Sequence, residues 1–265
     1  MIFLVILLLL GFVVDCHEGY THLSCDLKPR IRASRSHLDT TVSSGNWSGY
    51  VAAPNLLRPT FYTVTQVTGS WVVPNIVAAT VNTSCSIWVG IDGAGSYSVE
   101  QLGTEHDWTD GYETHYAWYE MFPAGSNEIV GFPVEVGDFI TASVSYSTLN
   151  GVIPIANGLF ILEIMNHTKK VYSVIPRISP AILERVCAEW IVEAPWLNQT
   201  LPLSDFGKIY MSECSAEITG IVGVINNPAW SHEAMNMVAP DGTKKSIVSA
   251  LSPDGSSFSV QWFHV

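Results

Sequence analysis

Short apolar runs separated by turn-forming residues dominate the chain from Asn46 to its C-terminus. In residues 140–146 (ITASVSY), apolar and polar side chains alternate with the two-residue period of a strand that has one buried face. Residues 258–262 (FSVQW) alternate in the same way, and Pro-Asp-Gly turns at 240–242 and 253–255 separate runs of this kind. Strands at such short spacing predict an all-β domain, most naturally a two-sheet antiparallel β-sandwich.

The first 45 residues differ from the rest of the chain. Residues 2–14 form an uncharged apolar run, which is shorter than the about 20 residues of a membrane-spanning helix and suits the core of a signal peptide. An uncleaved anchor is the alternative, because no basic residue precedes the run. We predict a signal peptide at 1–16, a propeptide or N-terminal arm at 17–45 and a single domain at 46–265. This organisation predicts a secreted, extracellular protein.

The charge balance narrows the range of partners. The chain has 24 acidic and 12 basic residues, for a formal net charge of −12. A nucleic acid is excluded as a partner, because its phosphates would be repelled by such a surface. Protonation of carboxylates at low pH would relieve the self-repulsion, so the composition suits an acidic environment. The alternative is an ordinary acidic secreted domain.

The cysteines and histidines give no sign of a metal site. The sequence contains neither a CxxC nor an HExxH motif, and its eight histidines are scattered. Once a signal peptide ending at Cys16 is removed, four cysteines remain: Cys25, Cys85, Cys187 and Cys214. An oxidising destination predicts one or two disulfides among them, with the pairing left open. No cofactor is expected.

The run AEWIVEAP at 188–195 holds two carboxylates in apolar surroundings. On a strand, Glu189 and Glu193 share one face and flank Ile191, because successive side chains point to opposite sides. Carboxylates among apolar neighbours are costly unless they are paired, hydrogen-bonded or used in chemistry. The pattern therefore indicates a cleft, with two exposed glutamates on an edge strand as the alternative.

Two further runs carry residues suited to a site. IWVGIDG at 87–93 ends eight residues before Gln101, and a carboxamide with a carboxylate could activate water and stabilise an oxyanion. In YETHYAWYEMFP at 112–123, Trp118 and Glu120 share one face with Tyr116, as in an aromatic-walled cleft. Packing in the core is the alternative for these aromatic residues. No GxSxG motif for a serine nucleophile is present.

Eight blocks of sequence, in order, closely resemble the glutamic peptidases called eqolisins, particularly their prokaryotic-type members. The blocks are NWSGYVA (46–52), GSWVVP (69–74), WVGIDG (88–93), VEQLGTE (99–105), YAWYEMFP (116–123), AEWIVEAP (188–195), LPLSDFG (201–207) and FSVQW (258–262). The resemblance implies a concanavalin-like jelly roll and an acid-active, pepstatin-insensitive endopeptidase made as a preproprotein. It implies no metal or cofactor, polypeptide substrates, and no stable membrane association after processing. We expect a monomer.

The resemblance also implies roles for individual residues. Gln101 and Glu193 fall on the positions of the family's catalytic glutamine and glutamate, which activate water for direct attack on the peptide bond. Trp88 and Glu120 fall on positions of the substrate cleft, and we add Trp118 and Glu189 as candidate substrate-binding residues. His115-Tyr116 departs from the fungal pattern, which has Asp before AWYE, so fungal subsite preferences are not transferred.

A carbohydrate-binding protein or a glycosidase is the alternative function. A lectin-like sandwich with the paired acids Glu189 and Glu193 could serve either role. Gln101 distinguishes the glycosidase from the peptidase, because a retaining glycosidase needs two carboxylates and has no use for a catalytic amide.

Overall fold

The computed structural model describes residues 41–147, 158–180, 183–197 and 199–265. The predicted signal peptide, most of the predicted N-terminal arm and Cys25 lie outside these residues. Within the described part of the chain, the structure is built from strands, and no helix there is long and apolar enough to cross a membrane.

Sixteen strands are found among the described residues. They are β1 (Thr41–Ser44), β2 (Trp47–Ala53), β3 (Val64–Val72), β4 (Ser86–Asp92), β5 (Val99–Thr109), β6 (Tyr112–Phe122), β7 (Asn127–Glu128), β8 (Phe139–Ser147), β9 (Leu159–Asn166), β10 (Val171–Ile178), β11 (Ala188–Glu193), β12 (Lys208–Ile218), β13 (Ile221–Val224), β14 (Ser231–Val238), β15 (Lys244–Val248) and β16 (Phe258–Trp262).

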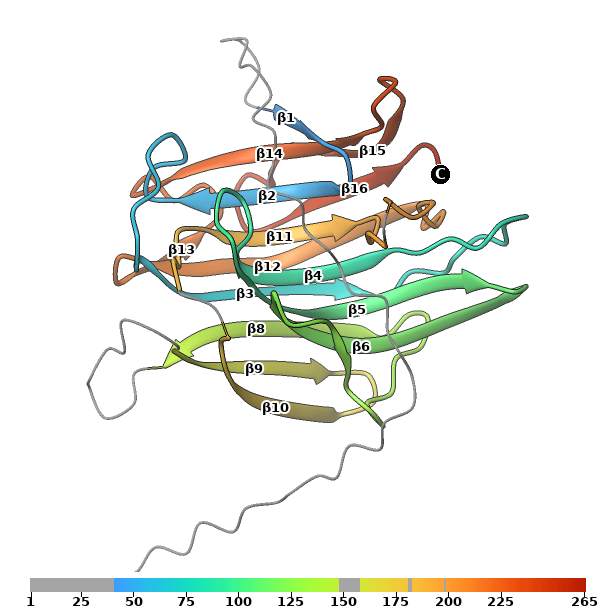
Figure 1. Ribbon diagram of the computed structural model, residues 1–265, viewed down its shortest axis with the longest axis horizontal. Helices are drawn as coiled ribbons and strands as arrows, with labels where there is room; N and C mark the ends of the chain where they lie inside the picture. The colour runs from blue at the N-terminus through green and yellow to red at the C-terminus, as the bar shows by residue number, and fades with distance from the viewer. Residues whose placement is uncertain (1–40, 148–157, 181–182, 198) are drawn as a thin grey trace, which may run out of the picture.

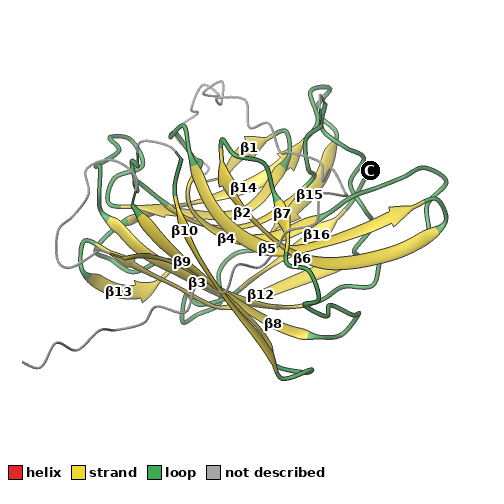
Figure 2. Cartoon of the chain, turned by 60° about the horizontal axis from the view of Figure 1, so that its bottom comes forward, coloured by secondary structure: helices red, strands yellow, loops and turns green. Residues whose placement is uncertain are grey.

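The strands form a β-sandwich whose two layers belong to one continuous hydrogen-bonded sheet. Its order is β10-β9-β8-β3-β12-β16-β15-β14-β2-β11-β4-β5-β6-β7, with β13 beside β12 and β1 beside β14. Neighbours along this path are antiparallel, whereas β1 and β14 are parallel. The path folds back on itself, so that β4 and β5 face β8 and β9 across the core, and Figure 2 shows the two layers crossing. The all-β sandwich prediction is confirmed.

The core lies between the layers and is held by large aromatic side chains. Trp71 on β3 and Trp190 on β11 are fully buried. The Trp71 indole donates a hydrogen bond across the core to Thr104 Oγ1 at 2.9 Å, and the Trp190 indole donates one to the Thr68 carbonyl at 2.8 Å. Each indole thus contributes apolar area while its N–H finds a partner in the opposite layer, which fixes how the layers stack.

One layer is formed by β14, β2, β11, β4, β5 and β6 (Figure 1). It is unusual because its central strands, β2, β11 and β4, are buried on both faces. Away from the main core, this layer carries a second apolar cluster: Trp47, Val51, Ala53, Trp88, Val99, Trp118, Val186, Cys187, Ile191 and Met235. The face that bears this cluster is called the second face below. Because β11 is buried on both the core side and the second face, AEWIVE is apolar throughout apart from its two acids.

The described cysteines do not confirm the disulfide prediction. Cys85, Cys187 and Cys214 are buried free thiols. Burial raises the pKa of each thiol, so these side chains are protonated and behave as small apolar groups. Cys25, the fourth cysteine of the prediction, lies outside the described residues.

Two buried acids tie the stability of the fold to acidic pH. Asp92 ends β4 and accepts hydrogen bonds from the backbone N–H groups of Arg185 at 2.6 Å and Val186 at 2.7 Å, while Glu100 on β5 accepts one from Ser179 Oγ at 2.8 Å. Burial raises the pKa of Asp92 from 3.8 to about 7 and that of Glu100 well above 4.5. An acid whose pKa is raised in the folded state contributes stability that is fully present below its unfolded-state pKa. That stability is lost as the pH rises through its folded-state pKa.

Replacing Glu100 by Gln is therefore expected to raise the melting temperature at pH 7.5 but not at pH 3.5. Glutamine keeps an acceptor for Ser179 and has no charge to bury, and a gain on the order of 1–2 kcal/mol corresponds to roughly 2–8 °C. Thermal melting of both proteins across pH 3.5–7.5 measures the difference. His106 and His115, whose pKa values are lowered by burial, act in the opposite sense below pH 6.5 in both proteins. An equal gain at both pH values would contradict the explanation.

Candidate active site

The six residues predicted for the site all lie on the second face. In an antiparallel pair, directly opposed residues share a face. The strand registers place them in three rows across β11, β4, β5 and β6: Glu189–Gly90–Gln101–Glu120, Ile191–Trp88–Gly103–Trp118 and Glu193–Ser86–Glu105–Tyr116. The two-residue period read from the sequence thus brings together groups that are as much as 105 residues apart in the chain.

Glu193 is buried, and each of its carboxylate oxygens accepts a hydrogen bond. Asn46 Nδ2 donates to Oε1 at 2.8 Å, and the Trp88 indole donates to Oε2 at 2.9 Å. Both donors are neutral, so they favour the ionised form of the carboxylate without cancelling its charge. A carboxylate held in this way is oriented and poised to take a proton.

Gln101 lies on β5, next to Glu120 on β6, and both side chains are buried. Gln101 Nε2 donates a short hydrogen bond to Glu120 Oε2. Gln101 Oε1 has no hydrogen-bond partner among the described residues. A carboxamide nitrogen carries two N–H groups, so one N–H remains for another acceptor after Glu120 is bound.

Trp88 connects the two candidate catalytic residues. Its indole nitrogen bonds to Glu193, while its ring lies against Gly90: a Cβ placed on Gly90 would be 2.9 Å from Trp88 Cζ3 and 3.2 Å from Gln101 Cβ. A Cβ on Gly103 would likewise lie 2.6 Å from Trp88 Cβ. Gly90 therefore leaves the space that the indole occupies, which gives the glycine of IWVGIDG a steric reason. Gly103 instead allows the close approach of β5 to the β4 backbone, where a Cβ would overlap the Ile87 carbonyl oxygen. The Trp47 ring packs edge-on against Trp88, with centroids 5.0 Å apart.

The structure does not place Gln101 and Glu193 in direct contact. Gln101 is two strands away from Glu193, in the row of Glu189, which precedes Glu193 by four residues on β11. In a flat sheet this offset separates the Cα atoms of Gln101 and Glu193 by roughly 16 Å. Trp88 lies in the row between them, and its indole bonds to Glu193.

The remaining candidates take different positions on the same face. Glu189 Oε1 accepts a hydrogen bond at 2.7 Å from the Ala94 N–H, so Glu189 anchors the turn that leads from β4 to β5. Trp118 is almost fully buried beside Gly103, and its indole N–H has no hydrogen-bond partner within the described residues. Trp118 thus offers a donor to a ligand, whereas one Glu189 oxygen is already used within the fold.

Sequence reasoning missed two neighbours of Glu193. Asn46 starts the NWSGYVA block, and the pairing of β2 with β11 brings it to Glu193. Glu105 belongs to the VEQLGTE block, and the two-residue period from Gln101 places it on the same face as Gln101. That period was a usable signal for Glu105. For Asn46, no local signal existed, because its contact with Glu193 depends on the pairing of distant strands.

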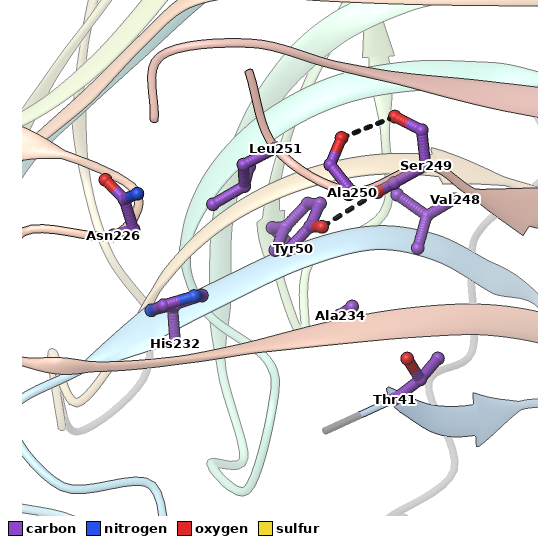
Figure 3. A pocket seen from close by; sticks show the side chains of 9 residues that line it. All are labelled: Thr41, Tyr50, Asn226, His232, Ala234, Val248, Ser249, Ala250 and Leu251. Carbon is purple, nitrogen blue, oxygen red and sulfur yellow. Dashed lines mark hydrogen bonds between the residues drawn. The ribbon is translucent and has the colours of Figure 1, made fainter. Parts of the chain in front are cut away.

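A separate cavity of about 480 Å³ holds none of the predicted residues. It opens beside β14 and the loop after β15, and its walls include His232 and Leu251 (Figure 3). Tyr50, on the core-facing side of β2, donates a hydrogen bond to the Ser249 carbonyl at 2.8 Å in its wall. Among the described residues, no group of three or more His, Cys, Asp or Glu side chains is placed to hold a metal ion.

Comparison with known protein sequences identifies relatives of the chain. A family model described as the peptidase A4 family matches residues 45–262. Aspergillopepsin-2 of Aspergillus niger is 25% identical over 201 residues, which cover 67% of this chain and 66% of that protein. Scytalidopepsin B of Scytalidium lignicola is 31% identical over 157 residues, which cover 58% and 53%. The chain thus matches slightly under two thirds of the first relative and about half of the second.

Solved structures show the same fold. A crystal structure of scytalido-glutamic peptidase with a transition-state analog inhibitor matches with a TM-score of 0.66 at 20% identity, over 83% of this chain and 99% of that one. Aspergilloglutamic peptidase from Aspergillus niger matches with a TM-score of 0.53 at 22% identity, over 68% and 99%. Since the family model spans nearly all of the sandwich, the chain belongs to the peptidase A4 family, the eqolisins that its sequence resembles.

Proposed function

We propose that the protein is a secreted glutamic endopeptidase that hydrolyses peptide bonds at acidic pH, with Glu193 and Gln101 as its catalytic residues. The observation that carries the proposal is the Trp88 indole, which binds the Glu193 carboxylate at one end and lies against Gly90 beside Gln101 at the other. The family relationship supports a peptide substrate. The N-terminal apolar run supports secretion.

Glu193 would act as the general base. Its ionised carboxylate takes a proton from a water molecule, whose oxygen attacks the peptide carbonyl carbon. The protonated Glu193 then gives that proton to the departing amine as the carbon–nitrogen bond breaks. Asn46 and Trp88 hold both oxygens in place, so the lone pair that receives the proton has a fixed direction.

Gln101 would stabilise the oxyanion of the tetrahedral intermediate. The N–H group that does not bind Glu120 is available as the donor, and Glu120 fixes the plane of the amide in advance. Donors oriented before the reaction are effective because they need no reorganisation when the charge develops. In this arrangement Glu120 orients Gln101, and Trp118 offers its indole N–H to the substrate backbone.

The protonation state of the fold supports acid activity. Burial raises the pKa values of Asp92, Glu100 and Glu105, so these acids are neutral and compatible with burial when the surroundings are acidic. As pH rises, burying their charges costs free energy. The chain is therefore suited to work in an acidic extracellular medium.

Digestion of casein by the purified protein across pH 2–7 tests the proposed activity, with pepstatin and EDTA added in parallel. Acid-range cleavage that neither inhibitor affects, and that a folded Glu193→Gln variant lacks, is the expected result. Cleavage that is blocked by pepstatin or EDTA would assign the activity to a different chemistry. A folded, processed protein that cleaves nothing at any pH would overturn the proposal.

Replacing Asn46 by Ala is expected to lower kcat about 10- to 100-fold with a small change in KM. The variant removes one of the two donors that orient Glu193, and a hydrogen bond to a charged group is worth about 1.5–3 kcal/mol. Steady-state kinetics on a peptide substrate measures the effect. Asn82→Ala is the matched control, since Asn82 bonds to Asp110 at an exposed hairpin and should leave kcat unchanged. Equal kinetics for the two variants would exclude an orienting role for Asn46.

A further inference from the structure

A third carboxyl group lies in the same row as Glu193. Glu105 on β5 is 7% exposed and is separated from Glu193 only by Ser86 of β4. Ser86 Oγ donates a short hydrogen bond to Glu105 Oε2. Glu105 therefore faces the proposed catalytic residue across a single polar side chain.

The surroundings of Glu105 hold more negative charge than the buried row can readily carry. On β5 itself, Asp107 is the next residue on the same face and forms a hydrogen bond with Glu105. Across the sheet, Tyr116 lies opposite on β6, and Glu193 lies beyond Ser86 on β11. Cys85, directly before β4, interacts with all three acids and is a protonated thiol. Within the described residues, no cationic side chain is among the groups that shift the pKa of Glu105.

This environment keeps Glu105 protonated at acidic pH. The pKa of Glu105 is raised well above 4.5, mainly by burial and next by the charge of Asp107. The charge of Glu193 raises it further. A neutral Glu105 can donate its O–H to Asp107, while its other oxygen accepts from Ser86. The row then contains one fewer charge, which is compatible with an ionised Glu193.

We propose that Glu105 is a positioning residue for the Glu193 end of the site. As a neutral acid it accepts a hydrogen bond from Ser86 of β4 and donates one to Asp107 further along β5. Its ionisation toward neutral pH breaks the bond to Asp107, adds a charge beside Glu193 and ends activity. The inference rests on the proposed peptidase function and adds the group that sets its upper pH limit. Ionised Glu105 can no longer donate to Asp107, and Glu105, Asp107 and Glu193 then form three neighbouring negative charges.

The Glu105→Gln variant separates the charge from the hydrogen bonds. Glutamine can accept from Ser86 and donate an N–H to Asp107 at every pH, so the arrangement no longer depends on a proton. The pH profile of kcat/KM on a peptide substrate is expected to extend upward by roughly one pH unit, or about tenfold in relative activity where the wild type has declined. The change should appear in kcat with little change in KM.

Glu100→Gln is the matched control. Glu100 is also a buried acid of β5 with a raised pKa, but it faces the core, opposite to Glu105. The Glu100→Gln variant should be more stable at neutral pH, while the pH at which its kcat/KM declines on the alkaline side of the profile should stay the same. The positioning role is wrong if kcat/KM of Glu105→Gln declines at the same high pH as that of the wild type. It is also wrong if Glu100→Gln shifts this decline by the same amount.

Hydrogen exchange distinguishes failure of this inference from failure of the peptidase proposal. Amides of 86–92 and 101–107 in the full chain, corrected for intrinsic rates, should be less protected at pH 7 than at pH 4 in the wild type. The difference should be several-fold smaller in Glu105→Gln. Equal loss of protection in both proteins would overturn the inference, whether or not the wild type cleaves peptides.

Discussion

Replacing Glu193 by Gln is expected to lower kcat for peptide hydrolysis by about 10³ or more. Glutamine retains an oxygen that can accept a hydrogen bond from Trp88 or Asn46, so the packing around position 193 is largely kept. It cannot take a proton from water or return one to the leaving amine, and both steps of the proposed mechanism lose their acid–base group. Kinetics with a peptide substrate at the acidic optimum measures the loss.

Glu189→Gln is the comparison for this effect. Glu189 lies on the same face of the same strand, four residues before Glu193, and one of its oxygens binds the Ala94 N–H. Its replacement keeps that acceptor and should cost far less in kcat than the change at 193. Retention of more than about a tenth of wild-type kcat by folded Glu193→Gln would remove Glu193 from the role of general base.

Replacing Gln101 by Ala is expected to lower kcat about 10²–10³-fold, which is the usual cost of losing one oxyanion donor. KM should change little, because the lost interaction is made mainly in the transition state. Kinetics on the same peptide substrate, together with thermal melting, measures the loss and checks that the protein remains folded.

A second variant tests how Gln101 is oriented. Glu120→Gln should give a smaller loss than Gln101→Ala, since a side-chain oxygen remains to accept the Gln101 N–H. A carbohydrate-directed enzyme would be almost insensitive to Gln101→Ala. An unchanged kcat in that variant would therefore contradict the oxyanion role and favour the sugar-directed alternative.

The sequence predicts the shared face of the site well because strand periodicity is local. Once 188–193 and 116–122 are read as strands, the side on which Glu193 and Glu120 lie follows from counting by two. The placement of Trp88 and Gln101 on the same face needs the pairing of β11, β4 and β5, which the family resemblance supplied indirectly. The all-β class follows from the same periodicity.

Other features depend on long-range pairing that no local pattern records. The hydrogen bond from Asn46 to Glu193 joins residues 147 positions apart. The merging of the two layers into one sheet depends on β15 and β16, whose short runs resemble any other hairpin. Cys85, Cys187 and Cys214, together with Cys25, suggested disulfides by their number, whereas the three described cysteines are buried free thiols.

The most direct test of the central claim is to measure kcat/KM of the Gln101→Ala/Glu193→Gln double variant against both single variants on one peptide substrate. If the two residues act on the same transition state, the double variant should be within about threefold of the slower single variant, because groups that work as a unit lose their effect together. Losses that multiply in the double variant would show two independent contributions. That result would contradict a Glu193–Gln101 catalytic pair.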